Sequence, residues 1–205
     1  MIEAFSLATA HLYQDALASQ ARLRHRIFVE RRSLPHSTYG GMEYDEFDTP
    51  AAVYLVWRDP GLVVRGLIRL LPTTLPYMLR SYWPYLVEDG KLPSSPDVWE
   101  ITRVCVDKSV EASTRQTILP ELLCGVSEYF ATNGIGAMIG VTRPHLLEHF
   151  IRTGVTWLGE LSEIEGEMER AFIVQREHIR PSAHCERYGI RGPVLESADA
   201  LRLAA

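Results

Sequence analysis

The 205-residue sequence lacks the features that mark membrane, secreted and nucleic-acid-binding proteins. No apolar run approaches the roughly 20 residues that a membrane-spanning helix needs. Residues 1–5 carry neither the basic stretch nor the long apolar stretch of a secretory signal. The formal net charge is −5, so no overall positive charge attracts nucleic acid. We therefore expect a cytoplasmic protein with no membrane span and no nucleic-acid partner.

Cysteine is also scarce, and its placement excludes two kinds of site. The three cysteines, Cys105, Cys124 and Cys185, are odd in number and widely spaced, and they form no Cys-x-x-Cys pair. Such spacing argues against a disulfide framework and against a zinc site. We expect no metal and no resident cofactor, and we expect buried free thiols at Cys105 and Cys124.

What remains is an ordinary globular composition, with 46% apolar and 23% charged residues. A chain of this length fits one domain. We expect residues 1–205 to form a single domain and a monomer, with the tail from about residue 180 the least clearly defined part.

The pattern of apolar residues predicts strands and helices that alternate along the chain. Strands are expected at 2–7, 51–57, 62–71, 99–107 and 137–142, with further apolar runs at 155–161 and 171–175, and helices at 8–30, 77–86, 113–132 and 145–152. Residues 31–50 read as a long loop, and loops of that length are usually functional or disordered. The order resembles the GNAT-type acyltransferase fold: an α/β protein with a mixed central sheet, helices on both faces and a V-shaped cleft at a bulged strand.

The expected strand at 99–107 is the most informative of these segments. Apolar and β-branched residues dominate it, yet it carries Glu100 and Arg103. In a regular strand these two side chains face opposite sides of the sheet, because side chains alternate. The spacing predicts either a β-bulge between them or two charges of which only one borders a cleft. An edge strand with two solvated charges is the alternative.

Other polar side chains interrupt apolar segments in the first half of the chain. Arg24 and Phe28 lie one turn apart on the expected first helix, while Asp45 and Asp48 lie in the long loop and Arg69 near a strand end. A cation beside an aromatic ring, opposite carboxylates, suits a zwitterionic ligand. The alternative for each is structural: a solvated helix arginine, a core phenylalanine or a solvated acidic turn.

Four motifs together resemble the ordered signature of acyl-homoserine lactone synthases, the LuxI-type autoinducer synthases. They are Arg24-x-x-x-Phe28, Glu43-Tyr44-Asp45-x-Phe47-Asp48, Arg69-x-x-Pro72-Thr73 and Glu100-x-x-Arg103. Each motif is weak alone, but four in this order and spacing are specific. One position departs from the family, which usually has tryptophan six residues after the phenylalanine, where this chain has Leu34. Either another aromatic residue, such as Tyr39 or Tyr44, covers the ligand, or the loop register differs.

The resemblance implies an acyltransferase that makes an N-acyl-L-homoserine lactone, a quorum-sensing signal. The amine of S-adenosyl-L-methionine, which is a substrate and not a cofactor, attacks the thioester carbonyl of an acyl donor. The donor is acyl carrier protein or acyl-CoA. The carboxylate of the methionine part then displaces methylthioadenosine and closes the lactone, a step in which positioning should dominate.

The resemblance also implies roles for individual residues. Glu100 is the candidate base that deprotonates the amine, directly or through water. A buried ion network is expected from Glu43, Asp48 and Arg69, and Arg103 is expected to join it. The candidate substrate contacts are Arg24, Phe28, Asp45, Arg103, Thr102, Thr142 and Trp83.

The walls of an acyl pocket are expected among apolar residues of the sheet and the short helix: Met78, Leu79, Met138, Val141 and Trp157, together with Thr102, Thr142 and Trp83. The same residues could be plain core. The four tryptophans favour a narrow pocket and hence a short or branched acyl group. Arg115, at a helix start, is a candidate for a phosphate of the donor.

Two other functions are compatible with the same sequence. The first is a GNAT-type N-acyltransferase that acts on a different amine, which would not need the Arg24 to Asp48 constellation. The second is a non-catalytic binding domain that uses the acidic loop as an interaction surface.

Overall fold

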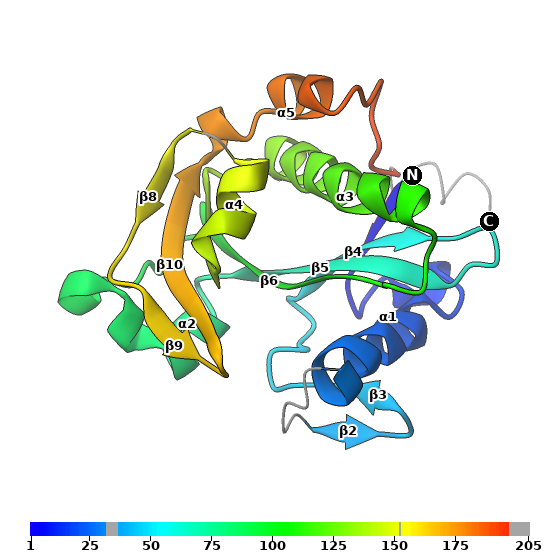
Figure 1. The fold of residues 1–205 in the computed structure, drawn as a ribbon, viewed down its shortest axis with the longest axis horizontal. Helices are drawn as coiled ribbons and strands as arrows, with labels where there is room; N and C mark the ends of the chain where they lie inside the picture. The colour runs from blue at the N-terminus through cyan, green and yellow to red at the C-terminus, as the bar shows by residue number, and fades with distance from the viewer. Residues whose placement is uncertain (32–36, 152, 197–205) are drawn as a thin grey trace.

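The computed structural model describes residues 1–31, 37–151 and 153–196. Its centre is an eight-stranded mixed sheet (Figure 1). The strands run in the order β1 (Ile2–Phe5), β4 (Val53–Arg58), β5 (Val64–Pro72), β6 (Val98–Val106), β7 (Ala137–Thr142), β10 (Glu167–Gln175) and β8 (Val155–Trp157), and β9 (Ser162–Ile164) pairs with β10. Neighbours are antiparallel except β6 and β7, which are parallel.

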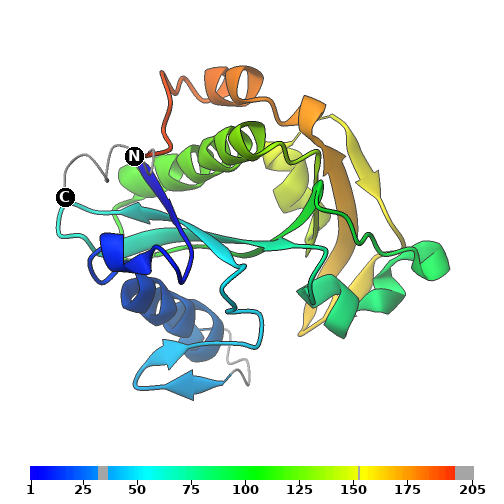
Figure 2. The ribbon, with the colours of Figure 1, turned by 180° about the vertical axis from the view of Figure 1, so that it is seen from behind.

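Helices cover both faces of this sheet, as Figures 1 and 2 show. One face carries α3 (Ala112–Asn133), α4 (Pro144–Phe150) and α5 (Pro181–Arg187), and the other carries α1 (Ala16–Arg24) and α2 (Met78–Tyr82). Because side chains alternate along each strand, two separate apolar clusters form. Leu67 and Ile139 pack on the α1 and α2 face, whereas Ile68 and Met138 pack on the α3 face. The GNAT-like mixed α/β arrangement is therefore confirmed.

The point where β6 and β7 separate lies in the middle of the sheet. Their parallel pairing ends at Ile101 and Gly140. A Cβ at Gly140 would lie 3.0 Å from Cγ2 of Ile101 and 3.1 Å from its carbonyl oxygen, so a larger residue would push the strands apart at this point. Beyond the last pair the two strands diverge, which opens the V that the fold predicts.

The β-bulge predicted from the spacing of Glu100 and Arg103 is present in β6. Leu67 of β5 is opposite Cys105, but Arg69, two residues on, is opposite Thr102, three residues back. The extra residue falls at Arg103 and Val104, and Arg103 has a φ of +51°, which is rare for a residue with a side chain. The bulge turns Arg103 to the same face of the sheet as Glu100 and Thr102.

Two expected elements differ from the structure. The helix predicted at 8–30 consists of a 3-10 turn (Ala10–Leu12), α1 and a π-helix (His25–Arg31), and α1 begins only after Asp15, whose φ is +53°. The loop predicted at 31–50 contains a hairpin of β2 (Thr38–Tyr39) and β3 (Met42–Glu43). Two-residue strands are too short to show a periodicity of two in the sequence.

The remaining short elements are 3-10 turns at Pro84–Leu86, Glu88–Gly90 and Arg176–His178. The segment after α5 returns to the first strand, where Leu195 bridges Ile2 in parallel. The three cysteines are free and buried, as expected for Cys105 and Cys124. Among the described residues, no helix is both long and apolar enough to cross a bilayer.

Candidate active site

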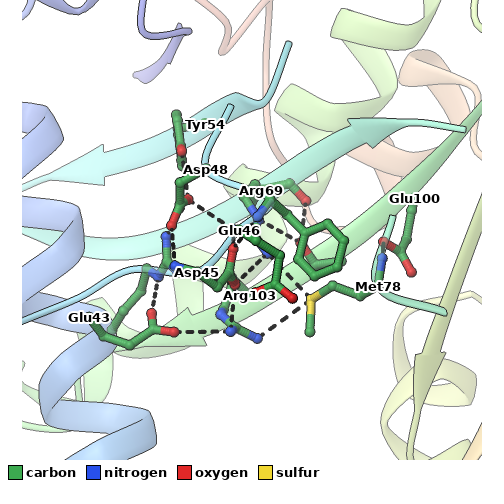
Figure 3. Close-up of polar contacts among 12 residues, drawn as sticks. Glu43, Asp45, Glu46, Asp48, Tyr54, Arg69, Met78, Glu100 and Arg103 are labelled. Atoms are coloured by element: carbon green, nitrogen blue, oxygen red, sulfur yellow. Dashed lines mark hydrogen bonds and ion pairs between the residues drawn. The ribbon is translucent and has the colours of Figure 1, made fainter. Parts of the chain in front are cut away.

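Six charged side chains meet on the face of the sheet that α1 covers, and we call them the ion cluster (Figure 3). They are Arg24 of α1, Glu43 of β3, Asp45 and Asp48 of the following loop, Arg69 of β5 and Arg103 of β6. Three guanidinium groups face three carboxylates, so the formal charges cancel. The close pairing explains how so many charges can be buried together.

Arg69 and Asp48 lie at the centre of the ion cluster. Arg69 Nη1 lies 2.6 Å from Asp45 Oδ1 and 2.8 Å from Asp48 Oδ1, and its Nε donates to Thr102 Oγ1 at 3.0 Å. Asp48 also accepts from the hydroxyl of Tyr54 at 2.7 Å. Burial alone would raise the pKa of Asp48, but the hydrogen bond and charge of Arg24 hold it well below its usual range.

Arg24 lies wholly inside the ion cluster. Its side chain has no exposed surface, and it contacts Glu43, Asp48 at 2.7 Å and Asp45 at 3.4 Å. Arg24 and Asp45, both predicted to contact substrate, take part in these ion pairs, and the substrate contact itself stays a prediction. Asp45 is held by Arg69 and by Arg103, at 2.6 Å from Arg103 Nη2. Because every one of these groups already has a charged partner, their arrangement is that of a scaffold.

Arg103 is the guanidinium of the ion cluster that has N–H donors without a carboxylate partner. Its Nη2 bonds Glu43 and Asp45, but its Nη1 faces only a sulfur, and its buried Nε has no hydrogen-bond partner among the described residues. The guanidinium carbon lies 5.2 Å from the ring centroid of Phe28, which is itself buried. Burial lowers the pKa of Arg103, although Asp45 and Glu43 oppose the shift. Phe28 thus supports Arg103 as well as contributing to the core.

Glu100 lies on the same face, in a different environment. Its side chain is 1% exposed, and its two oxygens accept the backbone N–H groups of Met78 at 2.8 Å and Leu79 at 2.7 Å, the first residues of α2. Burial raises the pKa of Glu100 from 4.5 to about 7, despite these two hydrogen bonds, which lower it. Glu100 therefore also anchors α2, a structural role that the strand pattern did not indicate.

The other predicted substrate contacts are spread over the site. Thr102 bonds Arg69, and Trp83, half-buried at the end of α2, packs against the α1 and α2 cluster. Strand alternation places Thr142 on the α3 face with Met138, opposite Val141. The expected acyl walls thus divide between two faces of the sheet, so they do not form one pocket lining.

Tyr39 and Tyr44 are the two residues predicted as a possible aromatic cover over the ligand, and this role stays a prediction. Tyr39 is 81% exposed in the β2–β3 hairpin, and Tyr44 is half-buried with its hydroxyl on the sulfur of Met42 at 3.2 Å. Leu34 lies outside the described residues. Arg115 is half-buried near the start of α3, and it donates to the carbonyl of Lys108 at 3.0 Å.

Three contacts at the site were not predicted from the sequence. The sulfur of Met78 lies 3.3 Å from Arg69 Nη2, the hydroxyl of Tyr82 bonds Glu46, and Tyr54 bonds Asp48. No motif indicates them, because each depends on a methionine or tyrosine side chain that is also common in an ordinary core. Among the described residues, no group of three or more His, Cys, Asp or Glu side chains could hold a metal ion.

The chain also matches known proteins over most of its length. The autoinducer synthase family model covers residues 9–176. Isovaleryl-homoserine lactone synthase of Bradyrhizobium diazoefficiens is 32% identical over 208 residues, covering 100% of this chain and 92% of the relative. An acyl-homoserine-lactone synthase of Pseudomonas aeruginosa is 30% identical over 173 residues, covering 82% and 83%.

Solved structures agree with these relatives. The structure of the CoA-dependent acyl-homoserine lactone synthase BjaI with SAM and isopentyl-CoA matches with a TM-score of 0.85 and 30% identity, over 100% of this chain and 98% of that chain. The synthase LasI matches with a TM-score of 0.71 and 27% identity, over 86% and 88%. The chain belongs to the autoinducer synthase family, and it is an acyltransferase of the acyl-homoserine-lactone synthase type.

Proposed function

We propose that this enzyme joins S-adenosyl-L-methionine to a short, branched acyl group delivered by coenzyme A, and that Glu100 is its catalytic base. The observation that carries the proposal is that Glu100 and Arg103 lie on one face of the bulged strand. Glu100 is a buried carboxylate with a pKa of about 7, and Arg103 is a guanidinium with donors that the ion cluster leaves unused. The two side chains meet the needs of the ammonium and the carboxylate of one amino acid.

Glu100 takes the proton that the substrate amine must lose before it attacks. A general base works best when its pKa lies near the working pH, which holds for this carboxyl group. Each of its oxygens accepts one backbone N–H and keeps a second lone pair for the proton. Glu100 therefore takes one proton from the ammonium, and the lone pair freed on the nitrogen then bonds to the thioester carbon.

The bulge supplies donors for the negative charge that forms on the thioester oxygen. Arg103 and Val104 have no partner across β5 in the ladder, so their backbone N–H groups lie outside the regular pairing, close to the point where β6 and β7 part. Backbone donors fixed at such a position stabilise an oxyanion without reorganisation. When this oxyanion collapses, the carbon–sulfur bond of the thioester breaks, and the second proton lost by the nitrogen passes to the departing sulfur, so that amide and free thiol result.

Arg103 holds the carboxylate of the methionine part for the second step. Its Nε and Nη1 are the donors that the cluster leaves without a carboxylate. Held in this way, the carboxylate attacks the γ-carbon, the carbon–sulfur bond breaks, and methylthioadenosine leaves as the lactone ring closes. Arg24, Asp45, Phe28 and Thr102 act on substrate only through Arg103 and Arg69.

The acyl group is proposed to lie on the α3 face, near Thr142. Met138 of β7 faces the same side of the sheet as Thr142 and would border the acyl group. The relative from Bradyrhizobium diazoefficiens is named for an isovaleryl product, and this name supports a short, branched acyl group. Trp83 would border the donor from the α2 side. Met138→Ala should shift the preference toward acyl chains longer by one or two carbons, by about tenfold.

The choice of donor is tested by release of methylthioadenosine. The full chain is incubated with S-adenosyl-L-methionine and with isovaleryl, butyryl and octanoyl groups, each carried on coenzyme A and on acyl carrier protein. We expect kcat/KM to be highest with isovaleryl-CoA, by about tenfold or more over the same acyl group on carrier protein. Equal or faster turnover with the carrier protein would overturn the assignment of coenzyme A, and a preference for octanoyl would overturn the assignment of a short chain.

A further inference from the structure

Met78 contacts both halves of the site. It is the first residue of α2 and is buried. Its sulfur lies 3.3 Å from Arg69 Nη2 and 3.6 Å from Arg103 Nη1, while its backbone N–H donates to Glu100 at 2.8 Å. Figure 3 shows this residue between the ion cluster and Glu100. One side chain thus connects the guanidinium proposed to hold the substrate carboxylate with the carboxylate proposed to deprotonate the amine.

The thioether completes hydrogen bonding that the carboxylates leave unfinished. A guanidinium has five N–H donors. Arg69 directs four contacts to Thr102, Asp45 and Asp48, and its fifth contact is the sulfur of Met78. For Arg103, the same sulfur is the partner of Nη1. Without it, Arg69 Nη2 and Arg103 Nη1 would each lose an acceptor, and each guanidinium would be oriented by its remaining contacts alone.

A methionine suits this position because it accepts hydrogen bonds without adding charge. A carboxylate here would give the ion cluster a fourth negative charge against three positive ones. A leucine would fill the same volume but accept nothing. The thioether is also flexible and polarisable, so it can contact two cations and still pack in the apolar cluster with Leu79.

We propose that Met78 is a positioning residue, which fixes the distance and orientation between Arg103 and Glu100 by bonding the first through its sulfur and the second through its backbone. The inference rests on the roles proposed above for those two residues. Because the sulfur and the amide belong to one residue at the start of α2, a shift of the side chain also shifts the donor that Glu100 accepts. The position of the base is thereby coupled to that of the carboxylate-binding arginine.

The test compares Met78→Leu with Met78→Gln in the full-length enzyme. Leucine removes the acceptor and keeps the volume, whereas glutamine returns a neutral acceptor on a side chain of similar length. We expect M78L to weaken binding of S-adenosyl-L-methionine, measured by calorimetry, by about tenfold, the size of one hydrogen bond to a charged group. M78Q should recover most of that loss. The KM for the acyl donor should change less than about twofold in either variant.

A second readout separates positioning from simple packing. If the start of α2 moves, Glu100 loses part of its hydrogen bonding, and the acid limb of the pH profile of kcat/KM should move upward by about half a pH unit or more in M78L. Ile68→Val, at a fully buried aliphatic side chain on the other face of β5, and Met168→Leu, at an exposed methionine, should leave both readouts unchanged. Thermal unfolding of all four variants is recorded alongside.

Three results would overturn the inference. The first is an M78L variant whose affinity for S-adenosyl-L-methionine and whose acid limb of kcat/KM both equal those of I68V. Another is M78Q no better than M78L, which would show that the acceptor is irrelevant. The third is a change confined to acyl-donor KM, which would make Met78 a pocket wall. Failure of the proposed base is distinguishable, because Glu100→Gln would then retain the acid limb while M78L still weakened binding of S-adenosyl-L-methionine.

Discussion

Asp48, in the loop over the sheet, and Glu100, on β6, are two carboxylates with little exposed surface and with opposite electrostatic environments. Asp48 is surrounded by guanidinium groups, which hold its pKa well below the usual range. Among the described residues, the hydrogen-bond partners of Glu100 are two neutral backbone N–H groups, and burial raises its pKa to about 7 although Arg69 and Arg103 oppose the shift. The comparison shows that the charge of the partners, and not burial itself, separates a permanently ionised scaffold group from one able to exchange a proton.

The two environments also have different roles in the site. The ion cluster fixes α1, β3, β5 and β6 against one another through charges that cancel, whereas Glu100 joins β6 to α2 without a charged partner. Loss of an arginine from the cluster would strand a carboxylate. Loss of the charge of Glu100 would strand none. Changes in the first region should therefore affect stability, and changes in the second should affect the reaction.

The largest effect is expected from Arg69→Met. The substitution leaves Asp45 and Asp48 with one guanidinium fewer in a buried setting, which should lower the free energy of unfolding by about 3–5 kcal/mol. Urea denaturation measures it. Arg22→Ala is the matched control, since Arg22 pairs with Asp15 at 2.8 Å on the exposed surface and should cost at most about 1 kcal/mol. A loss in R69M no greater than in R22A would mean that the cluster is not a stabilising scaffold.

Glu100→Gln should act mainly on turnover. Removing a general base typically lowers kcat/KM by about 100-fold or more, and the amide keeps one acceptor oxygen for α2. Initial rates of methylthioadenosine release measure the loss. Glu128→Gln is the control, because the carboxylate of Glu128 also accepts two backbone N–H groups, of Val194 and Leu195, far from the site. Comparable loss in both variants would reduce Glu100 to an anchor of α2.

A smaller effect is expected in the pH dependence of stability. The pKa of Glu100 is raised from 4.5 to about 7 in the folded state, so between these values the folded enzyme binds more protons than the unfolded chain. The contribution of Glu100 is fully present below the unfolded pKa and is lost as pH rises through the folded pKa. Relative to the parent, E100Q should become more stable by up to about 3 kcal/mol between about pH 4 and pH 8. A constant difference between the two proteins would contradict the raised pKa.

The fold, the bulge and part of the ion cluster could be predicted from the sequence, because charges that break an apolar pattern are visible in it. The odd spacing of Glu100 and Arg103 predicted the bulge, and the positive φ of Arg103 shows how the chain achieves it. The order of strands and helices predicted the fold. Glu43, Asp48 and Arg69 were assigned to an ion network, and the structure brings them together.

The division between the two regions could not be predicted, since it depends on partners distant in sequence. Nothing in the pattern around Glu100 shows that its partners are the amides of Met78 and Leu79, as backbone donors have no residue signature. That Arg24 and Asp45 contact substrate stays a prediction, and their ion pairs were not visible in the sequence for a related reason. An isolated arginine and a loop aspartate carry the same letters whether they face a substrate or each other, and only packing decides.

One measurement tests the central claim most directly: a carbon-13 NMR titration of the side-chain carboxyl groups in the folded enzyme, with E100Q for assignment. The account predicts one glutamate resonance that titrates with a midpoint at about pH 7 and is missing in E100Q. It also predicts an aspartate resonance, from Asp48, that does not titrate while the enzyme stays folded. If every carboxyl group, Glu100 included, lost its proton below about pH 5, the proposed base would already be ionised like the scaffold, and the account would be wrong.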